Sequence, residues 1–197
     1  AIGTALRGHN MIIFEYDNGG YMNTGYQLSY STPKGAKSAT SHVGSLQYGK
    51  TFFNKDMPEI MAAANIPYVA TVAECNPKDF AKAAYYAKNQ GMAYIKALSA
   101  CPLNWNDNPA TERAVIEAAV NCGYFPLYEV EKGITKLNYN HENSNKKMPV
   151  KQWFSMMGRT RHLVKEEYSS VVEEIQKEID ERFRKLKEKS VSINIKM

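Results

Sequence analysis

The sequence lacks the features that mark secreted, membrane-spanning and nucleic-acid-binding proteins. It holds three cysteines in 197 residues, which are too few and too scattered for a disulfide framework. No apolar run approaches the roughly 20 residues that a membrane span needs. No basic stretch followed by an apolar one opens the chain. We therefore expect a soluble, cytoplasmic protein with no membrane partner.

The charge pattern does not predict a nucleic-acid partner. The formal net charge is +5, but basic residues are interleaved with acidic ones, above all near the C-terminus. No DNA- or RNA-binding motif accompanies them. The hydrophobic content of 44% is ordinary for a globular protein and provides one sizeable core. Attraction to an acidic protein partner stays open.

The residues around 11–25 have the composition of a binding loop at the end of a strand. Met11–Tyr16 is a short run of apolar, β-branched and aromatic residues, which predicts a buried strand. Asp, Asn and two Gly follow directly, at the end of the strand where ligands gather in open α/β sheets. Oxygen atoms of Asp and Asn suit a hard cation. The same four residues also make ordinary turns, so composition alone leaves both interpretations open.

The continuation of the loop carries a resemblance to a known family. Asn23-Thr24-Gly25-Tyr26-Gln27 follows, and then Ser31-Thr32-Pro33-Lys34-Gly35-Ala36. Together with Asp17 and Asn18, this string resembles the diphosphate-binding (β) subunit of the 2-oxoacid:ferredoxin oxidoreductases, the pyruvate synthase family. In that family the loop closes over magnesium and thiamine diphosphate. The resemblance extends to about Leu163.

The resemblance implies a metal role for the first residues of the loop. Asn18 corresponds to a side-chain ligand of Mg²⁺, and Gly20 to a residue whose backbone carbonyl binds the same ion. Asp17 corresponds to an acid that positions the loop. The family also carries a Gly-Asp-Gly magnesium motif upstream, which this chain does not contain. A longer form of the chain or another polypeptide would supply it.

The resemblance also implies a substrate contact further along the loop. Asn23 corresponds to the amide that reaches the thiazolium ring and the bound oxoacid, so it is the predicted catalytic residue. Tyr21 and Thr24 complete the predicted cofactor-binding set. Tyr26 and Leu28 depart from the family pattern, and this departure leaves the identity of the oxoacid open.

Hydrophobic periodicity predicts alternating helices and strands after a long polar loop over residues 30–55. The predicted order is a helix from Asp56, a strand over 67–72, a helix from Asn76, a strand over 92–98 and a helix over 108–121. Such alternation is typical of parallel βαβ units. We therefore predict an α/β protein with a mainly parallel sheet flanked by helices, and the resemblance implies the thiamine diphosphate-binding fold.

We predict a division of the chain near residue 125. Residues 1–125 would form the C-terminal half of a thiamine diphosphate-binding domain, and 126–197 a C-terminal extension. The extension would hold a β-hairpin over 125–139 turning at a Lys-Gly pair, a polar loop over 140–147 and a charged docking helix over 165–189. The last residues, 190–197, would add an edge strand or stay disordered.

Cys101-Pro102 follows the predicted strand over 92–98. A lone cysteine at a strand end is usually a small buried apolar residue. The resemblance implies instead that Cys101 is the remote ligand of a [4Fe-4S] cluster, whose other three cysteines lie upstream in the family and are absent here. Cys75 and Cys122 match no ligand position and are predicted to be structural. The four histidines form no metal or triad pattern and are predicted to be surface or capping residues.

The resemblance implies a subunit of an oxidative decarboxylase. Its substrate would be a 2-oxoacid, pyruvate by default; coenzyme A would take the acyl group and ferredoxin the electrons. Another subunit would supply the glutamate on the pyrimidine side of the cofactor. Three alternatives stay open: the same chemistry on oxalate or on a branched or aryl oxoacid, a non-oxidative thiamine diphosphate-dependent decarboxylase, and a structural module without cofactor.

Overall fold

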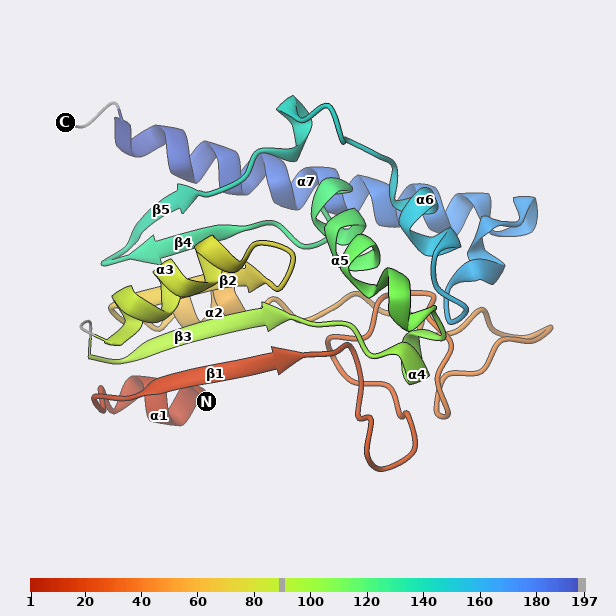
Figure 1. Cartoon of the computed structure of the whole chain (residues 1–197), viewed down its shortest axis with the longest axis horizontal. Helices are drawn as coiled ribbons and strands as arrows, with labels where there is room; N and C mark the ends of the chain where they lie inside the picture. The colour runs from red at the N-terminus through yellow and green to blue at the C-terminus, as the bar shows by residue number, and fades with distance from the viewer. Residues whose placement is uncertain (89–90, 195–197) are drawn as a thin grey trace.

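The computed structural model describes residues 1–88 and 91–194, and these residues form a five-stranded mixed sheet with helices on both faces (Figure 1). The strands lie in the order β1-β3-β2-β4-β5. β1, β3 and β2 run parallel, whereas β4 and β5 are antiparallel to their neighbours. The strand bounds are β1 Ile12–Asp17, β2 Tyr68–Ala73, β3 Ala93–Leu98, β4 Tyr128–Glu131 and β5 Ile134–Leu137.

Helices alternate with the parallel strands as the sequence predicts. The α-helices are α1 Ile2–Leu6, α2 Met57–Ala63, α3 Pro77–Lys88, α4 Pro102–Trp105, α5 Glu112–Asn121, α6 Val150–Ser155 and α7 Ser169–Asn194. Short 3₁₀ turns are Pro109–Thr111, His141–Asn143, Arg161–Val164 and Glu166–Tyr168. The predicted start of α2 is confirmed, because the Asp56 carboxylate accepts from the Glu59 N–H at 3.2 Å and Pro58 lies in the first turn.

The two faces of the sheet are covered by different helices. On one face, α1, α2 and α7 pack on strand residues such as Val69 and Tyr94. On the other face, α3 packs on Ala70 and Ile95. Because successive side chains of a strand point to opposite faces, β2 and β3 are buried throughout. Their near-continuous apolar sequence reflects this double burial.

A further core cluster lies beyond the carboxyl ends of the parallel strands. It joins α5, α6 and the start of α7 around two fully buried indoles, Trp105 and Trp153, whose ring centroids lie 6.4 Å apart. The long segment over residues 18–56 forms no helix and only isolated bridges, as predicted, and it contacts this cluster through Tyr48 and Phe53. This cluster is the platform of the candidate site.

The predicted β-hairpin is confirmed, and it belongs to the same sheet as the parallel strands. Lys132 and Gly133 form its turn with φ values of 49° and 82°. β4 pairs with β2, so the hairpin extends the sheet, and α7 packs against β5. The proposed boundary near residue 125 therefore crosses a continuous sheet.

Two predictions about the C-terminal part are wrong. Residues 190–194 continue α7 and add no edge strand, whereas residues 195–197 lie outside the described part. The helical spacing of its apolar residues places Ile179, Phe183 and Leu186 of α7 on the core. His141 is buried, not a surface residue, since its ring packs 4.1 Å from that of Phe183. Within the described residues, no helix is both long and apolar enough to cross a membrane.

Candidate functional site

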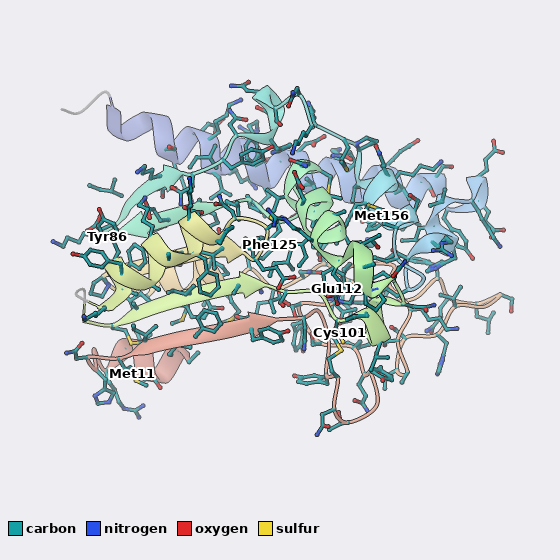
Figure 2. The ribbon with its side chains drawn as sticks, in the orientation of Figure 1. Met11, Tyr86, Cys101, Glu112, Phe125 and Met156 are labelled. Carbon is teal, nitrogen blue, oxygen red and sulfur yellow. The ribbon has the colours of Figure 1, made fainter. Side chains whose placement is uncertain are left out.

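β1 and β3 bring the two predicted site segments to the same edge of the sheet. Asp17, the last residue of β1, is in register with Leu98, the last residue of β3. The loop over residues 17–25, called the β1 loop below, therefore starts beside the segment that carries Cys101. Figure 2 shows Cys101 at the start of α4, next to the loop that follows β1. The parallel sheet thus joins residues that lie more than 80 positions apart in the sequence.

Asp17 organises the first turn of the β1 loop. It is 6% exposed; its Oδ1 accepts from the Gly19 N–H at 3.0 Å, and its Oδ2 lies 3.0 Å from Lys96 Nζ. Lys96 comes from β3 and also contacts Glu15 at 2.9 Å. Burial opposes the charge of Lys96, but Asp17 and Glu15 outweigh burial and raise its pKa above the usual value. The ion pair therefore fixes the carboxylate that shapes the turn.

The carbonyl groups of the next two residues are held from outside the loop. Trp105 Nε1 donates to the Asn18 carbonyl at 2.7 Å. The Gly19 carbonyl accepts from Thr32 Oγ1 at 2.9 Å and from the Arg159 guanidinium at 3.2 Å. Arg159 stacks on the Trp105 ring at 4.3 Å. Trp105 and Arg159 thus form a clamp that fixes the base of the β1 loop.

Burial of Arg159 has an electrostatic consequence. The side chain is 3% exposed, and burial lowers its pKa to about 10, with Tyr124, Asp17 and other nearby groups partly offsetting that effect. At neutral pH the guanidinium therefore remains a cation beside the loop. It is close enough to interact electrostatically with both Asp17 and Cys101.

Both Gly positions after Asn18 leave little room for a side chain. Gly19 has a φ of +72°, and a Cβ there would lie 2.9 Å from a guanidinium nitrogen of Arg159. At Gly20, a Cβ would lie 3.0 Å from Asn104 Nδ2 and 3.2 Å from the Gln27 carbonyl. The glycines let the chain pass between the clamp and Asn104. A larger residue at either position would have to move one of them.

The tip of the β1 loop is held mainly by contacts within the loop and its return. The Tyr21 N–H donates to the Gln27 carbonyl at 3.0 Å, and the Gln27 side chain bonds Thr24 at 2.5 and 2.6 Å. Tyr21, Asn23 and Thr24 are all exposed. Within the described residues, the side-chain amides of Asn18 and Asn23 make no hydrogen bond. Both amides are therefore available to a ligand.

The donor set fits part of a magnesium site. The Asn18 side-chain oxygen and the Gly20 carbonyl are neutral oxygen ligands of the kind that Mg²⁺ accepts, and Mg²⁺ needs about six. The described residues contain no group of three or more His, Cys, Asp or Glu able to hold a metal. The chain can therefore contribute some of the ligands, and the diphosphate, water or another polypeptide segment would have to supply the rest.

The three cysteines differ in their surroundings. Burial raises the pKa of Cys75 to about 11 and that of Cys122 to about 12, so both stay thiols at neutral pH. Cys122 is also buried among core residues. Cys101 is half-buried and begins α4 at the carboxyl end of β3. This position gives it access to the same edge of the sheet as the β1 loop.

Sequence reasoning assigned no role to the residues that hold the base of the loop. Trp105, Thr32, Lys96 and Arg159 carry these contacts. Lys50 supports them from behind, since its Nζ donates to the Thr32 carbonyl at 2.5 Å. One available signal was the position of Trp105, four residues after Cys101 at the end of a predicted strand. Nothing in the sequence pairs it with Arg159.

Comparisons with known proteins identify first the class and then the family. A family model described as the C-terminal thiamine pyrophosphate-binding domain of thiamine pyrophosphate enzymes matches residues 1–97. Together with the mixed sheet and its flanking helices, this match defines an α/β thiamine diphosphate-binding fold, as predicted.

Three of the relatives found are subunits of 2-oxoacid oxidoreductases. Pyruvate synthase subunit PorB of Methanocaldococcus jannaschii is 40% identical over 93% of this chain and 60% of that protein. The PorB subunit of Methanothermobacter thermautotrophicus is 39% identical over 87% of this chain and 59% of that protein. Ketoisovalerate oxidoreductase subunit VorB of Pyrococcus furiosus is 33% identical over 92% of this chain and 57% of that protein.

The chain belongs to the family of the β subunits of 2-oxoacid:ferredoxin oxidoreductases, and the predicted resemblance is confirmed. It spans about 60% of the length of the curated relatives that it matches. The chain also matches the solved structure of a 2-oxoglutarate:ferredoxin oxidoreductase from Magnetococcus marinus, with 26% sequence identity and a TM-score of 0.44. This match covers 51% of this chain and 34% of that chain, so we draw no conclusion from it.

Proposed function

We propose that the chain provides the magnesium and thiamine diphosphate loop of a 2-oxoacid:ferredoxin oxidoreductase that acts on pyruvate or a related oxoacid. The observation that carries this proposal is the β1 loop itself. Its Asn18 and Gly19 carbonyls are held by the clamp, while the side-chain amides of Asn18 and Asn23 are free of hydrogen bonds within the described residues. Such a loop, with a fixed base and side-chain amides that are free to bind, suits a ligand that is held through a metal ion.

Each residue of the loop has a defined task in this proposal. Asn18 and Gly20 hold Mg²⁺, and Asp17 keeps the turn in place through the Gly19 N–H and Lys96. Thiamine diphosphate, when bound, supplies the carbanion-stabilising chemistry that decarboxylation of a 2-oxoacid needs. Asn23 donates from the exposed tip to the oxoacid and orients it.

The remaining cofactor contacts come from the exposed tip and from outside the chain. Tyr21 and Thr24 lie against the cofactor, and the Thr24–Gln27 bonds keep their part of the loop in shape. A glutamate from another subunit contacts the pyrimidine. Coenzyme A takes the acyl group, and ferredoxin takes the electrons through [4Fe-4S] clusters.

The proposed magnesium role of Asn18 is tested by measuring how much thiamine diphosphate the protein binds. An Asn18→Leu variant of the native assembly should lose most of its bound thiamine diphosphate, because leucine offers no oxygen to the metal. Asn145→Leu is the matched control, since Asn145 is exposed on the loop over 140–147. Thiamine is measured after release from the purified protein. Full occupancy in the Asn18 variant would exclude the magnesium role.

We also propose that Cys101 is a ligand of a [4Fe-4S] cluster. Its half-buried position at the carboxyl end of β3 supports this role, and the remaining thiolates must come from outside the described residues. A Cys101→Ala variant should lose iron and its reduced-cluster electron paramagnetic resonance signal. Cys75→Ala should keep both. Equal iron in the two variants would contradict the assignment.

The overall activity is tested by anaerobic reduction of a viologen dye by the native assembly across a panel of 2-oxoacids. Reduction with pyruvate or a bulkier oxoacid that depends on coenzyme A would support the proposal and identify the substrate. Reduction by oxalate without coenzyme A would replace the proposed half-reaction. Aldehyde release without dye reduction would favour a non-oxidative decarboxylase, and no turnover by a preparation containing thiamine and iron would favour a structural module.

A further inference from the structure

A groove beside the β1 loop is lined by neutral and basic side chains. It has a volume of about 260 Å³, and its polar lining consists of Tyr26, Lys37, Asn104, Asn106 and Arg159. Among the described residues, no acidic side chain lines this groove, which is called the Lys37 groove below. Sites for drug-sized ligands usually measure roughly 300–1,000 Å³. The Lys37 groove therefore suits one small polar group.

Backbone hydrogen bonds hold the walls of the Lys37 groove together. The Lys37 N–H donates to the Arg159 carbonyl at 2.8 Å, and the Arg159 N–H donates to the Trp105 carbonyl at 3.2 Å. The Gly158 N–H donates to the Asn106 carbonyl at 2.9 Å, and a Cβ on Gly158 would collide with Asn106 Nδ2. Three distant segments thus form one frame. Because this frame needs no ligand to form, little ordering is required when a ligand binds.

Several polar groups of the groove have no partner within the described residues. Asn104 is 8% exposed, yet its side-chain amide makes no hydrogen bond there. The Tyr26 hydroxyl and the Asn106 amide also make none within residues 1–88 and 91–194. Buried polar groups are normally hydrogen-bonded, and an unmet one costs about 1–3 kcal/mol. The Asn104 amide therefore indicates a partner that binds in the groove.

The positive charge of the groove is not balanced. Arg159 is 3% exposed, and within the described part of the chain neither Arg159 nor Lys37 forms an ion pair. Arg159 Nε is also buried without a hydrogen-bond partner there. Burial lowers the pKa of Arg159 to about 10, because the nearby acidic groups only partly offset it. Since a buried charge is costly unless it is paired, an anion in the groove would be favoured.

We propose that the Lys37 groove binds an oxyanion, a carboxylate or phosphate group carried by a small molecule. Lys37 supplies a cation at the exposed rim, and the amides of Asn104 and Asn106 donate hydrogen bonds to the anion oxygens. The Tyr26 hydroxyl donates another. Arg159 acts through its charge from the buried wall. The proposal goes beyond the proposed function, which assigns none of these side chains to magnesium, thiamine diphosphate or the cluster.

The groove is joined to the base of the β1 loop. Arg159 donates to the Gly19 carbonyl at 3.2 Å, and Asn104 Nδ2 lies 3.0 Å from the place that a Cβ of Gly20 would take. Asn104 belongs to α4, which Figure 1 shows beside the loop that follows β1. A bound anion would therefore lie against the base of this loop.

Chemical labelling of Lys37 in the native assembly tests the proposal. Lys37 is exposed, so an amine-acylating reagent should modify it in chloride buffer, as mass spectrometry detects. Phosphate or acetate at matched ionic strength should lower this labelling about threefold when the site is two-thirds occupied. Lys132, exposed at the hairpin turn, is the control and should not change.

The two anions distinguish the sources of the oxyanion. Protection by phosphate alone would identify a phosphate group, and protection by acetate alone a carboxylate. No protection by either anion, or equal protection of Lys37 and Lys132, would overturn the proposal.

Substitutions of a rim residue of opposite charge test the electrostatic argument. Leu103 lines the groove and is 75% exposed. Leu103→Glu should raise the anion concentration that half-protects Lys37 by about threefold or more, and Leu103→Lys should lower it. Leu46→Glu, at a side chain that is 99% exposed, should leave it unchanged. Asn104→Leu should abolish protection. Effects of the same sign in both Leu103 variants would contradict an anion site.

Two further outcomes would assign the groove to another occupant. Lys37 that stays unlabelled in the assembly without added anion would show that another subunit covers it, and this would overturn the proposal. Protection by thiamine diphosphate but by neither small anion would assign the groove to that cofactor and would also overturn it. Asn18→Leu, which tests the magnesium role, should keep the anion protection of Lys37. Failure of the proposed function is thus read separately from failure of this site.

Discussion

The base and the tip of the β1 loop are held in different ways. At the base, Asp17 is buried and paired with Lys96, and the clamp of Trp105 and Arg159 holds the next two carbonyls. At the tip, Tyr21 and Asn23 are exposed, and the hydrogen bonds join residues within 21–27, apart from the Tyr26 carbonyl, which accepts from the Ala39 N–H at 3.0 Å. The base depends on segments from three distant parts of the chain. The tip is held mainly by hydrogen bonds among its own residues.

This difference suggests a division of labour. A rigid base sets the direction of the chain before a ligand arrives, so that less ordering is needed on binding. An exposed tip leaves its polar groups free to contact the ligand. Changes at the base should therefore lower the stability of the fold as well as ligand binding. Changes at the tip should affect ligand binding alone.

The largest effect is expected at Arg159. Arg159→Met removes a charge-assisted hydrogen bond to Gly19 and the stacking on Trp105, and we expect the free energy of unfolding to fall by about 2–3 kcal/mol. Denaturant unfolding measures this change. Arg161→Met is the control, because Arg161 is exposed. Equal stability of the two variants would mean that the clamp does not hold the base.

The next effect separates the two buried tryptophans. Both are fully buried, but Trp105 Nε1 donates to Asn18 whereas Trp153 Nε1 has no partner within the described residues. Trp105→Phe leaves the partly buried Asn18 carbonyl without this donor, so it should lower the free energy of unfolding by about 1–2 kcal/mol more than Trp153→Phe does. Chemical denaturation of both variants gives the comparison. A larger loss of stability in Trp153→Phe would show that packing, and not the hydrogen bond to Asn18, sets the cost of these substitutions.

Lys50 should give the base a characteristic pH dependence. Burial lowers the pKa of Lys50 to about 8, with Asp17 opposing the shift, whereas the unfolded chain keeps a value near 10.5. Between pH 8 and 10.5 the unfolded state holds the extra proton, so the contribution of Lys50 to stability rises with pH, by up to about 1.4 kcal/mol per unit. The stability difference between the wild type and Lys50→Met should therefore shift in favour of the wild type over this range. A constant difference would place the Lys50 pKa at its ordinary value.

The smallest effect on stability is expected at the tip. Asn23→Ala removes an exposed side chain that makes no hydrogen bond within the described residues, so the free energy of unfolding should change by less than about 0.5 kcal/mol. Oxoacid-dependent dye reduction by the native assembly should nevertheless fall at least tenfold if Asn23 contacts the oxoacid. A large loss of stability would show that Asn23, like the residues at the base of the loop, stabilises the fold.

Much of the fold follows from local patterns in the sequence. The apolar runs of β2 and β3 and the Asp-Met-Pro start of α2 predict their elements, because burial on both faces and helix capping leave direct signatures. The hairpin turn at Lys132-Gly133 is predicted in the same way. The C-terminal residues 190–194 were predicted less well, since their weak alternation of apolar residues resembles a strand although they continue a helix.

The sequence by itself determined the α/β class, the order of the parallel units and the loop whose residues identify the family. Only the tertiary structure decided how that loop is held. Trp105 and Arg159 lie 54 positions apart but hold the adjacent carbonyls of Asn18 and Gly19, because the segments after β3 and after α6 pack against the same end of the sheet. Contacts of this kind leave no periodicity in the sequence, since each depends on where the sheet places a distant backbone.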